Sequence, residues 1–164
     1  MSVRIANPAE ITAQDIENNA LQWAMADTLD PIIGKAMLCN TDTHDGGGIH
    51  WIVVLKISRE VGYIFDPLGP KNPRVNSRAM PTTTTIIAQL NAMRVHLYPY
   101  RVQALNNSLC GWYSIYIARL MNDYINQVSP RVVTPEELDA VIESQFGKSA
   151  TRGDIMKLAR AFAH

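Results

Sequence analysis

The segment "QALNNSLCGWYSIYIARLM", residues 103–121, predicts a helix that is buried on most sides and that begins with a thiol. From Gly111 onward only Ser114 and Arg119 interrupt an apolar run. At the N-terminus of a helix, backbone N–H groups and the macrodipole stabilise a thiolate over a thiol. Gly111 would let another backbone approach the sulfur closely. Cys110 is therefore a candidate nucleophile, and the alternative is a small buried hydrophobic residue.

A nucleophilic cysteine needs a partner base, and His50 is the best candidate in this chain. It lies in the β-branched and aromatic segment 49–57, which is joined to a similar segment, 61–66, by three residues, so the two predict an antiparallel hairpin. The hairpin places His50 opposite residue 68, to within two residues, and brings Asp66 within reach. A carboxylate there would orient the imidazole and stabilise its protonated form. The alternatives are a strand histidine with an ordinary hydrogen bond and the first residue of an Asp-Pro turn.

The other segments alternate helical and extended patterns and predict an α+β fold, in which a small mixed or antiparallel sheet packs against helices. The candidate nucleophile would then lie at the N-terminus of a central buried helix. Residues 1–164 are interpreted as one domain, because this length supports one core and no linker or repeat divides it. The further expected elements are a helix from Thr12 through Ala24, a polar loop at 39–48, a short helix at 82–93, a strand at 94–102 near an edge, and helices after Thr134 and at 154–163.

The composition is that of a compact, soluble, intracellular protein. Of the 164 residues, 47% are hydrophobic and 18% are charged, values that are typical of globular domains. Fifteen basic and fifteen acidic residues give a net charge of zero, so there is no electrostatic reason to expect nucleic acid or an anionic membrane as the main partner. No apolar run approaches the roughly 20 residues of a membrane-spanning helix, and there is no signal-peptide pattern.

No metal or cofactor site is indicated by the spacing of ligand residues. Cys39, His44 and Asp45 match no tight zinc pattern, and two cysteines cannot make a disulfide framework. The three glycines at 46–48 lack the spacing of a dinucleotide motif and are interpreted as a loop that admits substrate. His96 is interpreted as a structural histidine whose hydrogen bonds are satisfied.

Three blocks of this sequence together resemble the signature of a known family. They are "GGGIHWIVV" (46–54), "YIFDPLG" (63–69) and "VQALNNSLCGWY" (102–113). They are similar to the blocks of the adenovirus maturation protease family and, more distantly, to the SUMO-specific proteases of the same clan of cysteine peptidases. The acid follows the histidine by sixteen residues, and a glutamine precedes the cysteine by seven. The resemblance covers residues 49 to 113.

The resemblance implies a role for each matching residue. Cys110 would be the nucleophile, His50 the base that pairs with it, and Asp66 the residue that orients the imidazole. Gln103 would donate a side-chain N–H to an oxyanion hole completed by the backbone N–H of Cys110. Trp51, which faces away from His50 in an ideal strand, is expected to anchor the core, whereas the family's usual suggestion is that it shields the histidine.

The implied function is a cysteine endopeptidase that matures viral capsid or core precursors by cleaving next to glycine. Its partners would be those precursor proteins, and its location the host cytoplasm, nucleus or viral factory and the virion. One alternative is a protease that removes SUMO or ubiquitin-like modifiers, which also end in Gly-Gly. Another, of a different class, is a catalytically silent binding domain.

The resemblance also implies regulation. Family members are activated by a viral peptide through a disulfide to a cysteine between the triad acid and the nucleophile, and this chain has no cysteine between Asp66 and Cys110. Disulfide activation would need Cys39, so a differently activated or cofactor-independent enzyme is expected, with a peptide activator still open. Stimulation by DNA is implied as well, although the chain is neutral. A local basic patch could still form from Arg74, Arg78, Arg94 and Arg101.

Overall fold

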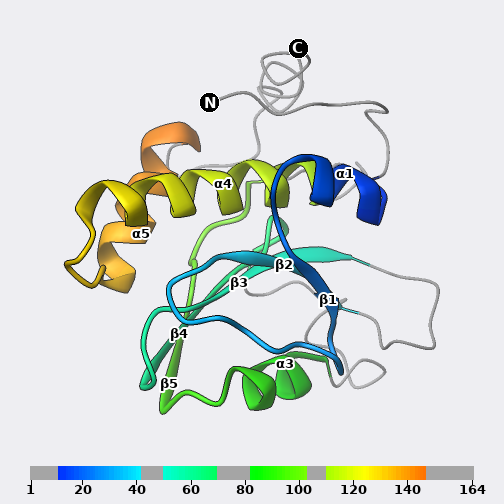
Figure 1. Ribbon diagram of the computed structural model, residues 1–164, viewed down its shortest axis with the longest axis horizontal. Coiled ribbons are helices and arrows are strands. Elements are labelled where there is room, and N and C mark those ends of the chain that lie inside the picture. Colours follow the sequence, from blue (N-terminus) through cyan, green and yellow to red (C-terminus); the bar gives the residue numbers. More distant parts are fainter. Residues whose placement is uncertain (1–10, 42–49, 70–81, 103–109, 147–164) are drawn as a thin grey trace.

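The structure is a computed structural model that describes residues 11–41, 50–69, 82–102 and 110–146. For residues 82–84, 110 and 146 it describes the backbone. Within these ranges the architecture is a mixed sheet of five strands with helices on both faces (Figure 1). The described part of the chain contains no helix long and apolar enough to cross a membrane.

The sheet has the strand order β1-β2-β3-β4-β5. Its two outer pairs, β1 with β2 and β4 with β5, are parallel, and its inner pairs are antiparallel. The prediction of a small mixed or antiparallel sheet is therefore confirmed in its mixed form. The strands are β1 (Trp23–Met25), β2 (Met37–Asn40), β3 (Trp51–Lys56), β4 (Val61–Phe65) and β5 (Arg94–Leu97). The helices are α1 (Ala13–Asn18), α3 (Thr82–Leu90), α4 (Cys110–Val128) and α5 (Pro135–Phe146).

The central hairpin β3–β4 has the predicted register, in which Val53 lies opposite Phe65. Both faces of β3 are buried, because α4 covers one face of the sheet and α3 the other (Figure 1). Val53 packs with Ile115 and other residues of α4 in one core cluster, while Ile52 packs with Ile86 of α3 in a second cluster. The near-continuous apolar run of β3 therefore reflects burial on two sides.

The first helix begins as predicted, since Thr12 caps α1 and forms a reciprocal capping box with Asp15. The prediction that it continues through Ala24 is wrong. Ala20 adopts a left-handed conformation (φ 60°), the N–H of Leu21 returns to the carbonyl of Ile16, and the chain then enters β1. Strand β1 is only three residues long and is stabilised by parallel pairing with β2. The local sequence therefore contains no strand pattern that would have argued against a helix.

Strand β2 was not predicted, and its last two residues, Cys39 and Asn40, were placed in a polar loop. All four of its residues are buried between β1 and β3. The edge position predicted for the strand after α3 is confirmed, and Pro99 lies just beyond the end of β5. That strand runs parallel to β4 because the connection passes through α3, as parallel neighbours require a crossover.

Helix α5 starts where the sequence indicated. The N–H of Glu137 donates to the Thr134 hydroxyl at 3.2 Å, and the Glu137 carboxylate accepts from Thr134, Arg131 and Tyr124. The helix expected at 154–163 lies outside the described residues.

Candidate active site

His50 and Asp66 form a short, buried pair at the start of the central hairpin. The Nε2 atom of His50 lies 2.6 Å from Oδ1 of Asp66, and their side chains are 1% and 8% exposed. The carbonyl of His50 accepts the N–H of Thr41 at 2.8 Å, which continues the β2–β3 ladder and fixes the histidine backbone. The predicted proximity of these two side chains is confirmed.

Asp66 is held in place by its own turn as well as by His50. Its Oδ1 accepts the N–H of Leu68 at 2.9 Å, and its carbonyl accepts the N–H of Gly69 at 2.9 Å. Gly69 has φ +86°, and a Cβ there would lie 3.2 Å from Cβ of Arg101. Asp66 therefore has both of the roles considered for it, since it opens the Asp-Pro turn and that turn directs its carboxylate at the His50 imidazole.

Helix α4 begins at Cys110 and packs across β3 and β2. Four residues further, one helical turn on the same face, the buried hydroxyl of Ser114 donates to the carbonyl of Trp51 at 3.0 Å. Trp51 directly follows His50. The N-terminal part of α4 is therefore fastened, through Ser114, to the residue beside the candidate base. The sequence analysis treated Ser114 only as an interruption of the apolar run. Its spacing of four residues from Cys110, which puts both on one helix face, could have marked it as a residue near the site.

Gly111 is required by a close contact, but the partner differs from the one expected. A Cβ at this position would meet Cγ1 and Cδ1 of Ile11 at 2.3 and 2.6 Å. A side chain from the segment before α1 therefore fills the space, rather than an approaching backbone. The glycine lets Ile11, just before α1, pack tightly against the start of α4.

Trp51 is half-buried and packs against the core cluster that includes α4, in agreement with the expected core role. Its ring makes an edge-to-face contact with Trp23, with centroids 6.2 Å apart and planes at 85°. Trp23 falls within the helix expected from Thr12 through Ala24, and it is instead 37% exposed on β1, at one edge of the sheet.

Cys39 lies on β2, between β1 and β3, with 0% exposure. Burial, with a smaller contribution from the charge of Asp27, raises the pKa of its thiol to about 12. The folded chain therefore does not present Cys39 for disulfide exchange with an activating peptide. Among the described residues there is no group of three or more histidine, cysteine, aspartate or glutamate side chains that could hold a metal ion.

His96 is a satisfied histidine, as predicted. Its Nε2 lies 2.7 Å from Oδ2 of Asp139 on α5, and its ring stacks on Tyr63 at a centroid distance of 5.4 Å. The Tyr63 hydroxyl donates to the other carboxylate oxygen of Asp139 at 2.5 Å. Burial, then this hydrogen bond, raises the pKa of Tyr63. The cluster ties α5 to β4 and β5.

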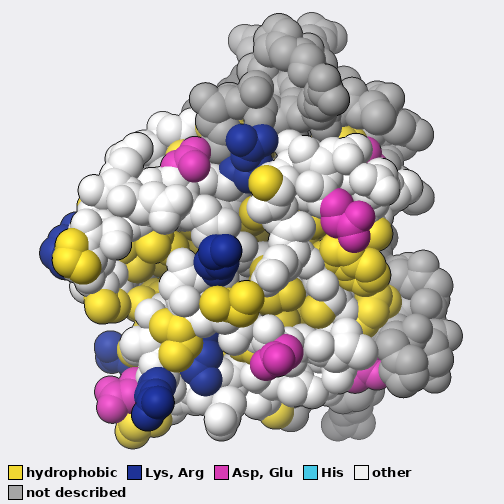
Figure 2. All heavy atoms as spheres, in the orientation of Figure 1, with side chains coloured by type: hydrophobic (Ala, Val, Ile, Leu, Met, Phe, Trp, Pro, Cys, Tyr) yellow, Lys and Arg dark blue, Asp and Glu magenta, His cyan; other side chains and the backbone are white. Residues whose placement is uncertain are grey.

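Several candidate residues lie outside the described residues: Gln103, His44, Asp45, Arg74 and Arg78. Of the proposed basic patch, Arg94 and Arg101 are described, and they lie on β5 and after it. On the face shown in Figure 2, basic and acidic side chains are interspersed, in keeping with the zero net charge.

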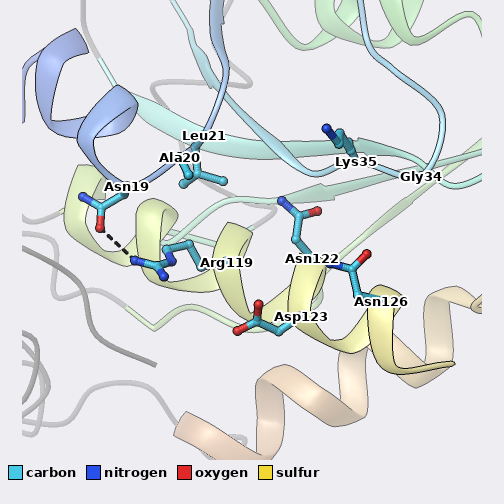
Figure 3. Close-up of a pocket in the computed structure, with 9 residues that line it drawn as sticks. All are labelled: Asn19, Ala20, Leu21, Gly34, Lys35, Arg119, Asn122, Asp123 and Asn126. Carbon is cyan, nitrogen blue, oxygen red and sulfur yellow. Dashed lines mark hydrogen bonds between the residues drawn. The ribbon is translucent and has the colours of Figure 1, made fainter. Parts of the chain in front are cut away.

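A polar hollow of about 260 Å³ lies along the C-terminal half of α4 (Figure 3), and His50 is not among the residues that line it. Some of the hollow's polar side chains form hydrogen bonds that join α4 to other elements of the fold. Arg119 donates to Asn19 at the end of α1 (3.2 Å), and Asn122 bonds both backbone groups of Ala36 before β2 (2.8 and 3.1 Å). The lining residues are Asn19, Ala20, Leu21, Gly34, Lys35, Arg119, Asn122, Asp123 and Asn126.

No protein-family model matches the chain, and no curated protein matches it. Among solved structures, the chain is similar to the ASFV pS273R protease, with 23% sequence identity and a TM-score of 0.30. The match covers 71% of this chain and 43% of that protein, so this chain spans less than half of its length.

Proposed function

We propose that this protein is a cysteine protease whose catalytic centre consists of Cys110, His50 and Asp66. The observation that carries the proposal is the buried 2.6 Å His50–Asp66 pair beside a helix that begins at Cys110. The three matching sequence blocks support it, because they contain these residues at the spacing of a cysteine peptidase family. The alternative of a silent binding domain does not require a buried carboxylate to orient a histidine.

The proposal gives the two imidazole nitrogens of His50 different tasks. Because Nε2 faces Asp66, Nδ1 is the nitrogen that would exchange a proton with the Cys110 thiol. Transfer of that proton gives a thiolate and an imidazolium, and Asp66 stabilises the positive charge. The position of Cys110 at the start of α4 adds the backbone N–H groups and the helix dipole, which also favour the thiolate.

Peptide cleavage would then follow the ordinary course of acyl transfer. The thiolate attacks the scissile carbonyl carbon, and the carbonyl oxygen becomes an oxyanion. The imidazolium gives its proton to the leaving amine as the C–N bond breaks, which leaves a thioester on Cys110. Water, deprotonated by His50, hydrolyses the thioester and regenerates the thiol.

The oxyanion hole is proposed to consist of the Gln103 side-chain amide and the backbone N–H of Cys110. Gln103 lies seven residues before the cysteine, and the assignment rests on the sequence resemblance. Loss of one such donor typically lowers kcat by about 100-fold to 1,000-fold.

The proposed substrates are viral capsid or core precursors cleaved next to glycine, in the infected cell or the virion. Any activating peptide would bind without a disulfide to Cys39, because that thiol has no exposed surface. The proposed chemistry needs no metal, and a peptide or nucleic acid activator stays open as a further partner.

The test is cleavage of a fluorogenic peptide library that places glycine on either side of the scissile bond, with Cys110→Ala as the matched control. Wild-type protein should cleave a subset of peptides, and Cys110→Ala none. A Gly-Gly-terminated SUMO fluorogenic substrate forms a second arm, and its selective cleavage would assign the modifier-protease alternative. Equal turnover by wild-type and Cys110→Ala proteins would contradict a cysteine protease.

A further inference from the structure

We infer that Ser114 is a positioning residue for the proposed catalytic centre, and that it sets the first turn of α4 against the strand that begins after His50. This inference rests on the proposed function. It assigns to Ser114 a role that acts through Cys110 and His50, without contact to the substrate.

The first step concerns the acceptor. The register that puts Val53 opposite Phe65 places Trp51 opposite Pro67 when it is carried back to the start of β3. The carbonyl of His50 bonds Thr41 on the β2 side, so the carbonyl of Trp51 points to the β4 side. Proline has no N–H, and Pro67 therefore cannot supply the ladder hydrogen bond. The Ser114 hydroxyl, at 3.0 Å, supplies the donor.

The second step concerns the donor. A serine inside a helix commonly bonds the carbonyl four residues back, which here is that of Cys110. The Ser114 hydroxyl instead reaches across to Trp51, 63 residues away in sequence. Ser114 is 0% exposed in an otherwise apolar stretch, so its hydroxyl needs an acceptor, and the Trp51 carbonyl meets that need.

The third step concerns location. Pro67 belongs to the Asp-Pro turn that aims Asp66 at His50, so the gap in the ladder is a consequence of the acid's placement. The group that fills the gap lies one turn from the proposed nucleophile. One hydrogen bond therefore joins the segments that carry Cys110 and His50, at the place where the Asp66 turn leaves the Trp51 carbonyl without a ladder donor.

Helix α4 offers an internal control two turns further on. Asn122 bonds the N–H and carbonyl of Ala36 at 2.8 and 3.1 Å, so it also fastens α4 to the sheet side of the molecule. It lies twelve residues after Cys110, or about 18 Å along the helix axis. Loss of either fastening should destabilise the fold, but only the loss of Ser114 should disturb the catalytic geometry.

The experiment compares Ser114→Ala and Asn122→Ala on the best peptide substrate of the wild-type protein, with unfolding in urea measured for each. Ser114→Ala should lower kcat about 10-fold to 100-fold with KM nearly unchanged, the penalty typical of a small misplacement of reacting groups. It should also slow alkylation of Cys110 by iodoacetamide at mildly acidic pH, where only a histidine-paired thiolate reacts. Asn122→Ala should lose stability and retain kcat.

A second pair of variants removes the ambiguity of a misfolded alanine variant. Ser114→Thr keeps the hydroxyl. Ser114→Val has nearly the same shape as Ser114→Thr but carries a methyl group in place of the hydroxyl, so kcat should be higher for the threonine variant. Equal kcat for these two, or equal kcat losses for Ser114→Ala and Asn122→Ala, would overturn the inference. Cleavage by Cys110→Ala would instead contradict the proposed function, so the two failures are distinguishable.

Discussion

Two histidine–aspartate pairs in the described part of the chain have nearly the same length and different surroundings. The His50–Asp66 pair (2.6 Å) is almost fully buried and lies beside a helix that begins with a cysteine. The His96–Asp139 pair (2.7 Å) is 33% and 17% exposed, and its third member is the Tyr63 hydroxyl. A short carboxylate–imidazole distance alone therefore does not mark a catalytic site.

The carboxylates of the two pairs are also held differently. The Asp66 carboxylate accepts the backbone N–H of Leu68 in its own turn, so it can orient a histidine without relying on it. Asp139 projects from α5 and serves as the acceptor that joins this helix to β4 and β5. In the proposed function the first pair presents an imidazole to the nucleophile, whereas the second pair fastens α5 to the sheet.

The largest expected difference between the pairs is in activity. Asp66→Asn should lower kcat/KM by about 10,000-fold, as happens when a triad acid no longer fixes the histidine tautomer. Asp139→Asn should leave kcat/KM within about twofold, because it touches no reacting group. Steady-state cleavage of the same peptide by both variants measures this difference. Comparable losses in the two would remove the distinction drawn here.

Stability should show the second difference. Asp139→Ala removes the acceptor of both Tyr63 and His96 and should lower the free energy of unfolding by about 1–3 kcal/mol. Urea unfolding, with Glu136→Ala as a control on the same helix, measures the effect. An Asp139→Ala protein as stable as the wild type would show that the second pair does not fasten α5.

A substitution near the first pair tests how tightly that region is packed. Gly111→Ala should destabilise the protein by about 1–3 kcal/mol, because its Cβ would overlap the Ile11 side chain. The double variant Gly111→Ala/Ile11→Ala should recover part of the loss relative to the two single changes. Strictly additive effects in urea unfolding would show that the two residues do not compete for this space.

The smallest expected effect is the pH dependence of the α5 cap, close to the second pair. Hydrogen bonds from Arg131, then from Tyr124, lower the pKa of Glu137 to about 2 from 4.5. A lowered pKa in the folded state stabilises the fold above pH 4.5, and this stabilisation is lost as the pH falls towards 2. The Tm difference between wild-type and Glu137→Gln proteins should therefore shrink over that range. A constant difference would contradict the assignment.

The sequence predicted the first pair because a hairpin is a local structure. Three connecting residues restrict its register, so the distance between His50 and Asp66 followed from counting. The starts of α1, α3 and α5 could also be predicted from short patterns such as the Thr12–Asp15 box, whereas α3 ends at Leu90, three residues before the predicted end. Each depends on residues within a few positions of one another.

The missed features depend on distant partners. Strand β1 exists through pairing with β2, and β2 through burial between two strands, so neither has a strong local pattern. The Ser114–Trp51 bond and the Asp139 partner of His96 connect residues 63 and 43 positions apart. The role of Gln103 remains a prediction, since it lies outside the described residues.

The central claim is that the His50–Asp66 pair activates the Cys110 thiol. The most direct measurement is the rate of iodoacetamide alkylation at pH 6, located on each cysteine by mass spectrometry, in wild-type, His50→Ala and His96→Ala proteins. Cys110 should react rapidly in the wild type and in His96→Ala and at least about tenfold more slowly in His50→Ala, while buried Cys39 stays unlabelled. An unchanged rate in His50→Ala would contradict the claim.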